Sequence, residues 1–362
     1  MHKRPRIAVY LSAHGYGHCT RTAALCLELA SRLDPEFHLR ASTPRFLWPQ
    51  QLAGSTVTWD ERPCDVGVVQ SDDLTVDLGA TRGAIDRWRE AVPDRLEEEV
   101  QWLRSEAVDL LLGDVPPMAF VAAANAGVPS VAVANFSWDW IYEGMGFETA
   151  AREAADAYAV AGLLIELTPA APMPAFPRRL TVGMIGRRSS RDGREVRRCL
   201  GVTDGEQLIL PAFRSRAGDF LSLPAPRPGI RYVQPSAVGS SDTRGARSDL
   251  VTLGPDVDFV DAVAAADVIV AKPGYGIIGD SMRAGVRLLY TERSGFPEDP
   301  VLRAWLEAQP GTAPISPERL AAGDWRDELE CLLASPRPQP VGDAPLQAAG
   351  EAIEGALTGA AR

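Results

Sequence analysis

The sequence predicts an α/β fold of two Rossmann-like domains that face each other across a cleft, and two glycine-rich turns support this most directly. The first turn, His14–His18, follows the apolar run IAVYLSA and precedes a helical pattern that continues to Leu33. The second turn, Lys272–Gly276, follows ADVIVA and precedes IIGDSMRAG, whose apolar spacing and final Gly285 predict a short helix. One strand-to-helix glycine turn in each half of the chain indicates two units of the same type.

Composition agrees with two domains. The chain has 362 residues, and a single core stops growing at about 250 to 300. Its net charge of −11 argues against nucleic acid or an anionic membrane surface as a partner. His14 interrupts the N-terminal apolar run, so we expect a buried strand there rather than a signal peptide, and no stretch is apolar enough for a membrane span. Sparse cysteines without CxxC spacing favour reduced thiols, and hence a cytoplasmic location.

Short apolar runs alternate with helical patterns along both halves. We expect strands at residues 7–13, 38–43, 57–60, 109–113, 130–134, 207–212, 230–233, 267–271 and 287–291. Between the two halves, prolines and small polar residues at about 166–190 indicate an interdomain linker. The expected organisation is an N-terminal domain at 1–168, the linker at 169–190, a C-terminal domain at 191–345, and a last helix within 346–362 that packs back on the first domain.

The chemistry of such turns favours an anion. A turn into a helix directs backbone N–H groups and the positive end of the helix dipole to one point, and Gly274 and Gly276 leave room for a phosphate. The spacing matches neither GxGxxG nor a P-loop, so each turn alone could also be ordinary turn chemistry. Asp280 could accept bonds from ribose hydroxyls. The adjacent Glu298 and Asp299 could bind sugar hydroxyls, or could simply cap their helix.

Several segments carry a family resemblance. In chain order they are HGYGHCTRT, QSDDLTVD, GDVPPMA, NFSWDWIYE, PMPAF, AKPGYG and FPEDPVLR. They resemble the glycosyltransferase-like N-terminal domain of plant L-arabinokinases and its bacterial relatives, over about residues 7–308. More distantly, the two glycine turns resemble the N-acetylglucosaminyltransferases of peptidoglycan synthesis and the glycosyltransferases that modify natural products. This resemblance implies a GT-B fold, with the donor nucleotide bound mainly by the C-terminal domain and the acceptor mainly by the N-terminal domain.

The resemblance also implies catalytic residues. His18 stands where related transferases place their general base, and histidine suits proton removal near neutral pH. Alternatively, His18 only caps its helix. Asp114, at the end of VDLLLGD, is the alternative base or the group that orients the histidine, and it could also be a helix cap.

Further residues follow from the same resemblance. On the acceptor side we expect His14, Tyr16, Gly17, Arg21, Asp72, Asn135, Ser137, Trp138 and Asp139. Trp138 could stack on a sugar face or belong to the core. On the donor side we expect Arg214, Phe259, Val260, Lys272, Gly274, Tyr275, Gly276, Asp280, Glu298 and Asp299. The sequence departs from the pattern at PAFRSRAG, where relatives carry glycines, and at Asp280, where glutamate is usual.

The expected activity is therefore metal-independent transfer of a sugar from a nucleoside-diphosphate sugar, as co-substrate, to an acceptor, with inversion. No cofactor and no metal site are expected. The acceptor could be a small molecule, such as a natural product, or a lipid-linked intermediate. A sugar-nucleotide epimerase or hydrolase, or a non-catalytic sugar-nucleotide-binding protein, are the alternatives. No kinase-type phosphate loop is found in the sequence, so arabinose kinase activity is not implied. Acceptor, nucleobase and oligomeric state stay open.

Overall fold

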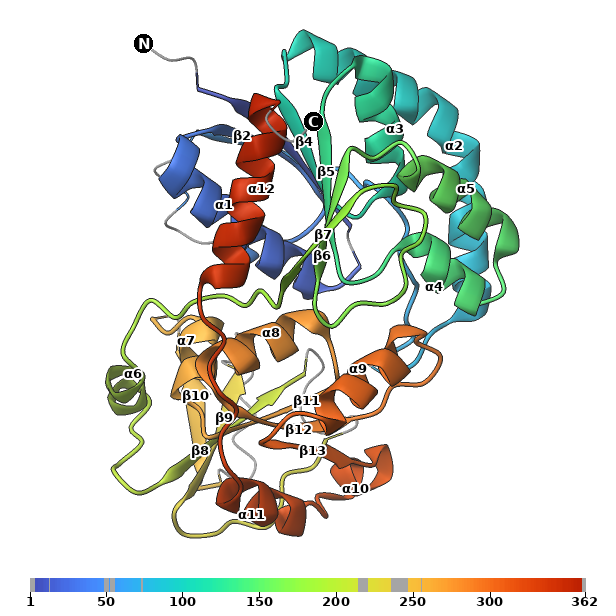
Figure 1. Cartoon of the computed structure of the whole chain (residues 1–362). Helices are drawn as coiled ribbons and strands as arrows, with labels where there is room; N and C mark the ends of the chain where they lie inside the picture. Colours follow the sequence, from blue (N-terminus) through green and yellow to red (C-terminus); the bar gives the residue numbers. More distant parts are fainter. Residues whose placement is uncertain are drawn as a thin grey trace.

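The computed structural model describes residues 4–12, 14–48, 52, 56–72, 74–213, 221–235, 247–254 and 256–359. These residues form two α/β domains, one above the other in Figure 1, and each domain is a parallel sheet covered by helices. The sheet orders are β3-β2-β1-β4-β5-β6-β7 and β10-β9-β8-β11-β12-β13. Buried apolar side chains pack on both faces of each sheet, as expected for parallel sheets. The predicted α/β fold class is confirmed.

The first sheet and its helices occupy the N-terminal half. The strands are β1 (Arg6–Leu11), β2 (Glu36–Arg40), β3 (Val57–Asp60), β4 (Leu110–Asp114), β5 (Ser130–Ala134), β6 (Leu163–Leu167) and β7 (Arg179–Gly183). The helices are α1 (Tyr16–Leu33), the short 3-10 helix η1 (Arg45–Leu47), α2 (Leu78–Ser105), α3 (Pro117–Ala126), α4 (Trp138–Gly144) and α5 (Glu148–Tyr158).

The second sheet and its helices follow. The strands are β8 (Gln207–Ala212), β9 (Ile230–Pro235), β10 (Leu250–Leu253), β11 (Val268–Ala271), β12 (Arg287–Thr291) and β13 (Thr312–Ile315). The helices are α6 (Gly193–Cys199), α7 (Phe259–Ala265), α8 (Tyr275–Ala284), α9 (Glu298–Glu307), α10 (Pro317–Ala322), α11 (Arg326–Ala334) and α12 (Ala344–Thr358).

The strands β6, β7, β10 and β13 are not predicted from the sequence. β10 and β13 have four residues each, which is too short for a clear apolar period. β7 lies inside the range 169–190 that we expected to be a linker, and it is the partly exposed edge strand of the first sheet. The first sheet therefore extends to Gly183, and the chain crosses to the second domain after it.

Strand register brings two predicted site segments together. β1 and β4 pair in parallel with Leu11 opposite Asp114, so the carboxyl ends of both strands meet at one edge of the sheet. β1 leads into the first glycine turn, and β4 ends at Asp114. Parallel pairing alone therefore places the turn of α1 beside this carboxylate.

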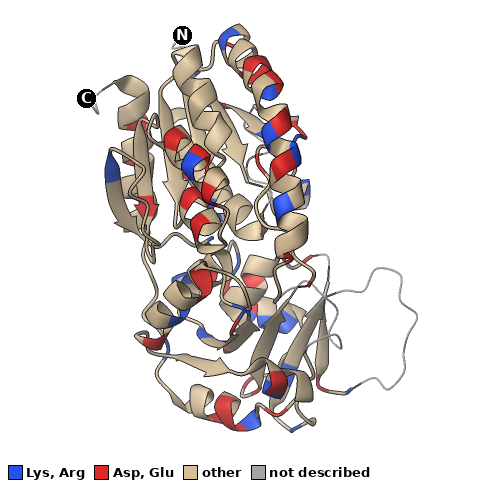
Figure 2. Ribbon diagram, turned by 90° about the vertical axis from the view of Figure 1, so that its right-hand side faces the viewer, with Lys and Arg blue, Asp and Glu red and all other residues tan. Residues whose placement is uncertain are grey.

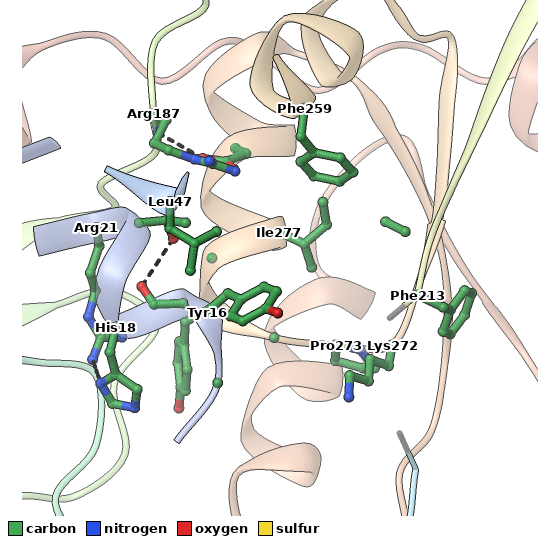
Figure 3. Close-up of a pocket in the computed structure, with 18 of the residues that line it drawn as sticks. Tyr16, His18, Arg21, Leu47, Arg187, Phe213, Phe259, Lys272, Pro273 and Ile277 are labelled. Atoms are coloured by element: carbon green, nitrogen blue, oxygen red, sulfur yellow. Dashed lines mark hydrogen bonds and ion pairs between the residues drawn. The ribbon is translucent and has the colours of Figure 1, made fainter. Parts of the chain in front are cut away.

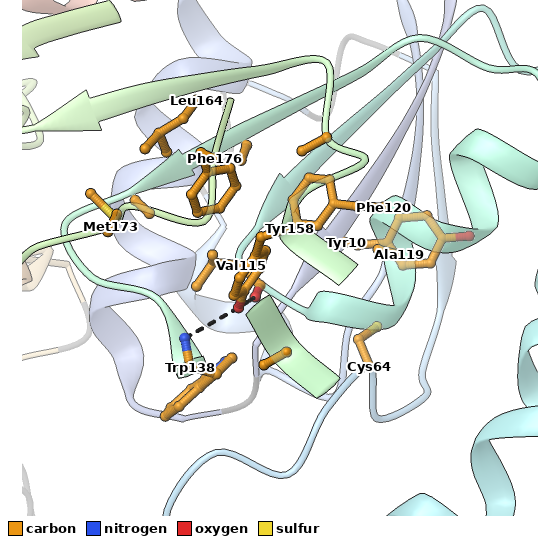
Figure 4. Close-up of a cluster of buried hydrophobic side chains, with 14 of the residues drawn as sticks. Tyr10, Cys64, Val115, Ala119, Phe120, Trp138, Tyr158, Leu164, Met173 and Phe176 are labelled. Atoms are coloured by element: carbon orange, nitrogen blue, oxygen red, sulfur yellow. Dashed lines mark hydrogen bonds between the residues drawn. The ribbon is translucent and has the colours of Figure 1, made fainter. Parts of the chain in front are cut away.

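A buried aromatic cluster fixes the end of β4 from behind (Figure 4). The Tyr158 hydroxyl donates to the Val115 carbonyl at 2.7 Å and accepts from the Trp138 backbone N–H at 3.2 Å. Phe120 packs directly on Gly113, where an added Cβ would lie 2.7 Å from the ring. Gly113 thus lets Phe120 lie against the strand immediately before Asp114.

The two glycine turns touch across the domain interface. A Cβ on Gly276 would lie 2.9 Å from the Gly17 Cα, so the starts of α1 and α8 are in backbone contact. Nearby, the crossing chain passes α8 so closely that a Cβ on Gly186 would lie 2.1 Å from the Gly279 carbonyl oxygen. Glycine is required at these positions because the approach is backbone to backbone.

A second interdomain contact involves the QSDDLTVD segment. Thr75 and Ser294 form an isolated parallel β-bridge, and the Ser294 N–H donates to the Leu74 carbonyl at 2.9 Å. This segment of the first domain therefore also binds the loop that precedes α9 in the second domain.

The last helix returns to the first domain. α12 lies beside α1 in Figure 1, and Arg32 of α1 donates to the Glu354 carboxylate at 3.0 Å. A Cβ on Gly350 would meet the side chain of Glu28, which shows how closely the two helices pack. α12 thus joins the end of the described chain to the domain in which the chain begins.

The charged residues are spread over the surface. Lys and Arg are interspersed with Asp and Glu on the helices that cover the sheets (Figure 2), so the net charge of −11 is not gathered on one helix. Among the described residues, no helix is both long and apolar enough to cross a membrane.

Candidate active site in the interdomain cleft

A cavity of about 390 Å³ lies between the two domains, and both glycine turns line it (Figure 3). From the first domain come His14, Gly15, Tyr16, Gly17, His18, Thr20, Arg21, Leu47, Gln70 and Phe136. From the second come residues of β8, α8 and α9 together with Lys272 and Phe259. The turns predicted from sequence to face each other therefore share one cavity.

His18 pairs with Asp114 at this cavity. The imidazole Nδ1 lies 2.7 Å from Asp114 Oδ1, and both side chains are buried. A carboxylate only accepts, so Nδ1 carries the proton when the neutral ring binds Asp114, and Nε2 is then the proton acceptor. Nδ1 also lies 2.8 Å from the Arg21 guanidinium, to which it could bind only in the other tautomer. Because His18 lines the cavity, the pair has the arrangement of a general base with its orienting carboxylate. Asp114 itself does not line the cavity, which favours the orienting role over the alternative that Asp114 is the base.

Asp114 accepts more bonds than this one. Arg21 binds both of its carboxylate oxygens, with Nε at 2.7 Å from Oδ2, and the Thr22 hydroxyl donates to Oδ2 at 2.7 Å. Arg21 also donates to the Asn135 side-chain oxygen at 2.9 Å. Burial alone would raise the pKa of Asp114, but the charges of Arg21 and His18 outweigh it and hold that pKa below its ordinary value. The carboxylate is therefore ionised.

The helix starts supply sites for an anion. α1 begins after Gly15 and α8 begins after Gly274, and neither helix has a side-chain cap among the described residues. Glycine has no side chain that could cap a helix, so a ligand in the cavity could accept from the N–H groups where both helices start. A Cβ on Gly274 would point into open space, so this position is accessible to a ligand.

Asp280 does not present a free carboxylate. Its Oδ1 accepts from the Arg187 backbone N–H at 2.7 Å, and its Oδ2 accepts from the Arg187 guanidinium at 2.6 Å. Asp280 and Arg187 line the cavity together, although Asp280 is only 3% exposed. We expected Asp280 to meet the ribose. In the structure its carboxylate binds Arg187 instead, and so attaches the segment that connects the two domains to α8.

We therefore expect Asp280→Ala to lower the free energy of unfolding by about 1–3 kcal/mol, because it removes the acceptor of charge-assisted bonds to Arg187. Asp343→Ala is the matched control. Asp343 is partly exposed and pairs with Arg283 at the other interdomain crossing, so its loss should cost under about 1 kcal/mol. Urea denaturation measures both. If both substitutions lowered the free energy of unfolding equally, Asp280 would not attach the connecting segment to α8 as we infer.

Glu298 and Asp299, the pair predicted to bind sugar hydroxyls, do not both reach the cavity. Glu298 lines the cavity, but Asp299 does not. Asp299 instead accepts from the Arg293 backbone N–H at 3.1 Å and pairs with Arg303 at 2.9 Å. Burial raises the pKa of Asp299, and these cations oppose that rise. Only Glu298 is placed to meet a ligand, and Asp299 positions Arg293.

The predicted acceptor side is also divided. His14, Tyr16, Gly17 and Arg21 line the cavity, whereas Asp72, Asn135, Ser137, Trp138 and Asp139 do not. Asp72 is exposed and accepts from the Leu74 N–H at 2.7 Å in the interdomain loop. Asn135 is buried and binds Arg21. Burial raises the pKa of Asp139.

Trp138 belongs to the core rather than to a sugar platform. It is fully buried, and its indole N–H donates to Asp65 at 2.8 Å. Its ring lies edge-on to His14 at 5.4 Å and 6.4 Å from the His18 ring. Trp138 therefore supports the first glycine turn from beneath.

Most of the other residues predicted to bind the donor lie on the side of the cavity that the second domain forms. Lys272, Tyr275 and Phe259 line the cavity, and Val260 lines a neighbouring hollow of about 280 Å³ that shares Arg187 with it. Arg214 lies outside the described residues. The cavity also has lining residues that the sequence did not predict, among them Leu47, Phe136, Arg187, Phe213 and Arg293. NFSWDWIYE could have indicated Phe136, since it stands beside Asn135.

The described residues contain no group of three or more His, Cys, Asp or Glu that could hold a metal ion.

Comparisons with known proteins concern the fold. No family model matches the chain. L-arabinokinase of Arabidopsis thaliana is 31% identical over 337 residues, which is 89% of this chain and 32% of that protein. The chain thus spans about a third of the length of this curated relative.

Solved glycosyltransferase structures match almost the whole chain. Phytolacca americana UGT2, complexed with UDP-2-fluoro-glucose and pterostilbene, has a TM-score of 0.61 at 12% identity and covers 99% of this chain and 94% of its own. The glycosyltransferase of kitacinnamycin has a TM-score of 0.59 at 14% identity, with coverages of 99% and 98%. SnogD from Streptomyces nogalater has a TM-score of 0.57 at 14% identity, with coverages of 98% and 95%. The chain therefore has the GT-B fold of nucleotide-sugar glycosyltransferases.

Proposed function

We propose that this protein is a glycosyltransferase that moves a sugar from a nucleoside-diphosphate sugar to an acceptor hydroxyl or amine. The observation that carries the proposal is the position of the His18–Asp114 pair and two uncapped helix starts at one interdomain cavity. The pair supplies a proton acceptor, and the helix starts supply N–H groups for the diphosphate. Lys272 adds positive charge to the donor wall, which supports a reaction that needs no metal.

The reaction follows from these groups. The acceptor O–H transfers its proton to His18 Nε2, and the electron pair of that bond attacks the anomeric carbon. The bond from that carbon to the diphosphate oxygen breaks, and the nucleoside diphosphate leaves with the bonding electrons. A single displacement of this kind inverts the anomeric configuration. The helix starts stabilise the negative charge that grows on the diphosphate.

The acceptor-side wall supports a small, largely apolar acceptor. Tyr16, Leu47 and Phe136 line it, and the Phe136 ring lies edge-on to His18 at 5.5 Å. An apolar wall beside the base would orient a flat or aliphatic molecule with one hydroxyl toward Nε2. UGT2 is complexed with pterostilbene as well as with UDP-2-fluoro-glucose, and we propose a natural product or a lipid-linked molecule as the acceptor of this protein.

Release of nucleoside diphosphate tests the proposal. The protein is incubated with UDP-, dTDP- and GDP-sugars, with and without a panel of small phenolic and aliphatic alcohols, and the products are identified by mass spectrometry. Acceptor-dependent release with a glycosylated product supports the transferase. Release of free sugar without acceptor supports a hydrolase, and conversion of one nucleotide sugar into another supports an epimerase. Binding without any turnover supports a non-catalytic sugar-nucleotide-binding protein.

A further inference from the structure

The hydroxyl of Tyr275 is a buried polar group that has no hydrogen-bond partner among the described residues. Tyr275 is the first residue of α8 and lines the interdomain cavity, and the residue as a whole is only partly buried. Burial raises the pKa of this phenol above its ordinary value, so the hydroxyl keeps its proton and can both donate and accept. A buried hydroxyl without a partner costs free energy that phenylalanine at the same position would avoid.

The Tyr275 ring connects the two domains. Although α8 belongs to the second domain, the ring packs against apolar clusters of both domains. Its centroid lies 5.7 Å from that of Phe136 in the first domain, and the Phe136 ring lies edge-on to His18 at 5.5 Å. Tyr275 therefore extends from the start of α8 to the wall of the cavity that contains the proposed base.

A transferred sugar has to lie at this position. The sugar is bonded to the diphosphate on one side, and its anomeric carbon must face an acceptor oxygen beside His18 on the other. The diphosphate is proposed to bind where α8 starts, and α1, which carries His18, touches that point through Gly17 and Gly276. Tyr275 is the first side chain of α8 next to this point. A sugar between the diphosphate and His18 is therefore adjacent to the Tyr275 ring.

A carboxylate lies near the same hydroxyl. Among the charged groups that act on the Tyr275 hydroxyl, Glu298 has the strongest effect, and Glu298 also lines the cavity. Its Oε1 accepts from Arg293 at 3.2 Å. A sugar hydroxyl both donates and accepts, so it can donate to a carboxylate while it exchanges a second hydrogen bond with a phenol. The carboxylate and the phenol together match the hydroxyl groups of a sugar.

We propose that the Tyr275 hydroxyl binds a hydroxyl group of the transferred sugar, beside Glu298. This inference rests on the proposed function, and it goes beyond the expectation that Tyr275 meets the diphosphate. Because the ring contacts both domains, a sugar that enters between them separates the ring from its present neighbours and supplies the missing partner. Tyr275 then distinguishes a nucleotide sugar from the nucleoside diphosphate alone.

Calorimetric titration of Tyr275→Phe tests the inference, because this substitution removes one oxygen atom and keeps the ring. UDP, dTDP and GDP and a panel of hexose and pentose nucleotide sugars of each are titrated without acceptor. In Tyr275→Phe we expect the tightest-binding nucleotide sugar to bind at least about fivefold more weakly, because a hydrogen bond is lost, and its parent diphosphate to bind within about twofold of the wild type. Unchanged affinity for the nucleotide sugar, or an equal loss for the diphosphate, overturns the inference.

Tyr290→Phe is the matched control. Tyr290 on β12 also has a buried hydroxyl without a partner among the described residues, but it does not line the cavity. This variant should bind both ligands as the wild type does. Both variants should have a Tm at or above that of the wild type, because neither loses a hydrogen bond of the free protein.

Two further outcomes are decisive. A Tm of Tyr275→Phe several degrees below that of the wild type, or failure of this variant to fold, shows that the hydroxyl already has a partner in the free protein and overturns the inference. If no nucleotide sugar binds the wild type, the proposed function fails, and the inference fails with it. Binding to the wild type therefore separates the two failures.

Kinetics gives a second readout. With a donor and acceptor identified, Tyr275→Phe should raise the KM for the nucleotide sugar by about fivefold or more, and the inhibition constant of the released diphosphate should stay near its wild-type value. A merely structural role of Tyr275 would change both constants together.

Discussion

Replacing His18 by alanine is expected to lower kcat by about two to four orders of magnitude, because the acceptor proton then has no positioned base. The side chain is buried against Asp114 and Phe136 but lines the cavity, so its loss should remove chemistry more than fold. Nucleoside diphosphate release with donor and acceptor measures kcat. Circular dichroism and the Tm show whether the variant is folded.

His38→Ala is the matched control for this substitution. His38 lies on β2, and its Nδ1 is 3.0 Å from the Thr58 hydroxyl, outside the cavity. It should keep the wild-type kcat within about twofold, as expected of a half-buried side chain without contact to the chemistry. If folded His18→Ala retained the rate of His38→Ala, His18 would be a helix-start residue only, and the base would have to be sought elsewhere.

The largest effect on stability is expected from Asp114→Ala. This substitution leaves the Arg21 guanidinium buried without a carboxylate, with only the uncharged partners Asn135 and His18 near it, and it removes the acceptor of Thr22. Breaking a buried ion pair by removing one partner costs about 3–5 kcal/mol. Guanidinium chloride denaturation measures the loss. Asp72→Ala, at an exposed loop carboxylate, is the control and should change stability by under about 1 kcal/mol.

The same carboxylate gives a pH dependence with a definite sign. Because the pKa of Asp114 is lowered in the folded state, its ionisation stabilises the fold fully above the ordinary aspartate value of about 3.9. This contribution is lost as the pH falls below that value toward the folded-state pKa. The stability difference between wild type and Asp114→Ala should therefore be constant from about pH 5 upward and shrink in acid. A difference that grows in acid would contradict the assignment.

Sequence analysis predicted what depends on local pattern. Apolar runs followed by glycine turns indicated β1–α1 and β11–α8, and the parallel order of strands then placed both turns in one cleft. His18 and Asp114 lie far apart in sequence, and the register of β1 against β4 brings them together. The glycine turns follow from local pattern, whereas the roles expected of His18 and Asp114 came from the family resemblance.

Several side chains have roles that could not be predicted from the sequence, because these roles depend on hydrogen-bond or packing partners elsewhere in the chain. Asp280 in α8 and Asp299 at the start of α9 were expected to meet a ligand, yet Arg187 and Arg293 bind them instead. Trp138 shares a motif with Asn135, but the fold turns its ring into the core beneath His14. Arg21 was expected to meet the acceptor, whereas most of its hydrogen bonds go to Asp114 and Asn135. A motif shows that a residue is near a site, and only its partners show what it does there.

The most direct test of the proposed donor site is calorimetric titration of UDP, dTDP and GDP into the wild type, Gly274→Ala and Gly342→Ala. Gly274 and Gly342 both have open space where a Cβ would be added, and Gly274 has an extended backbone with φ −156, so neither substitution should disturb the fold. We expect one nucleotide to bind the wild type and Gly342→Ala equally, and Gly274→Ala at least about tenfold more weakly, a loss of about 1.4 kcal/mol. Failure of all three nucleotides to bind the wild type, or unchanged binding to Gly274→Ala, would contradict a diphosphate site at the start of α8.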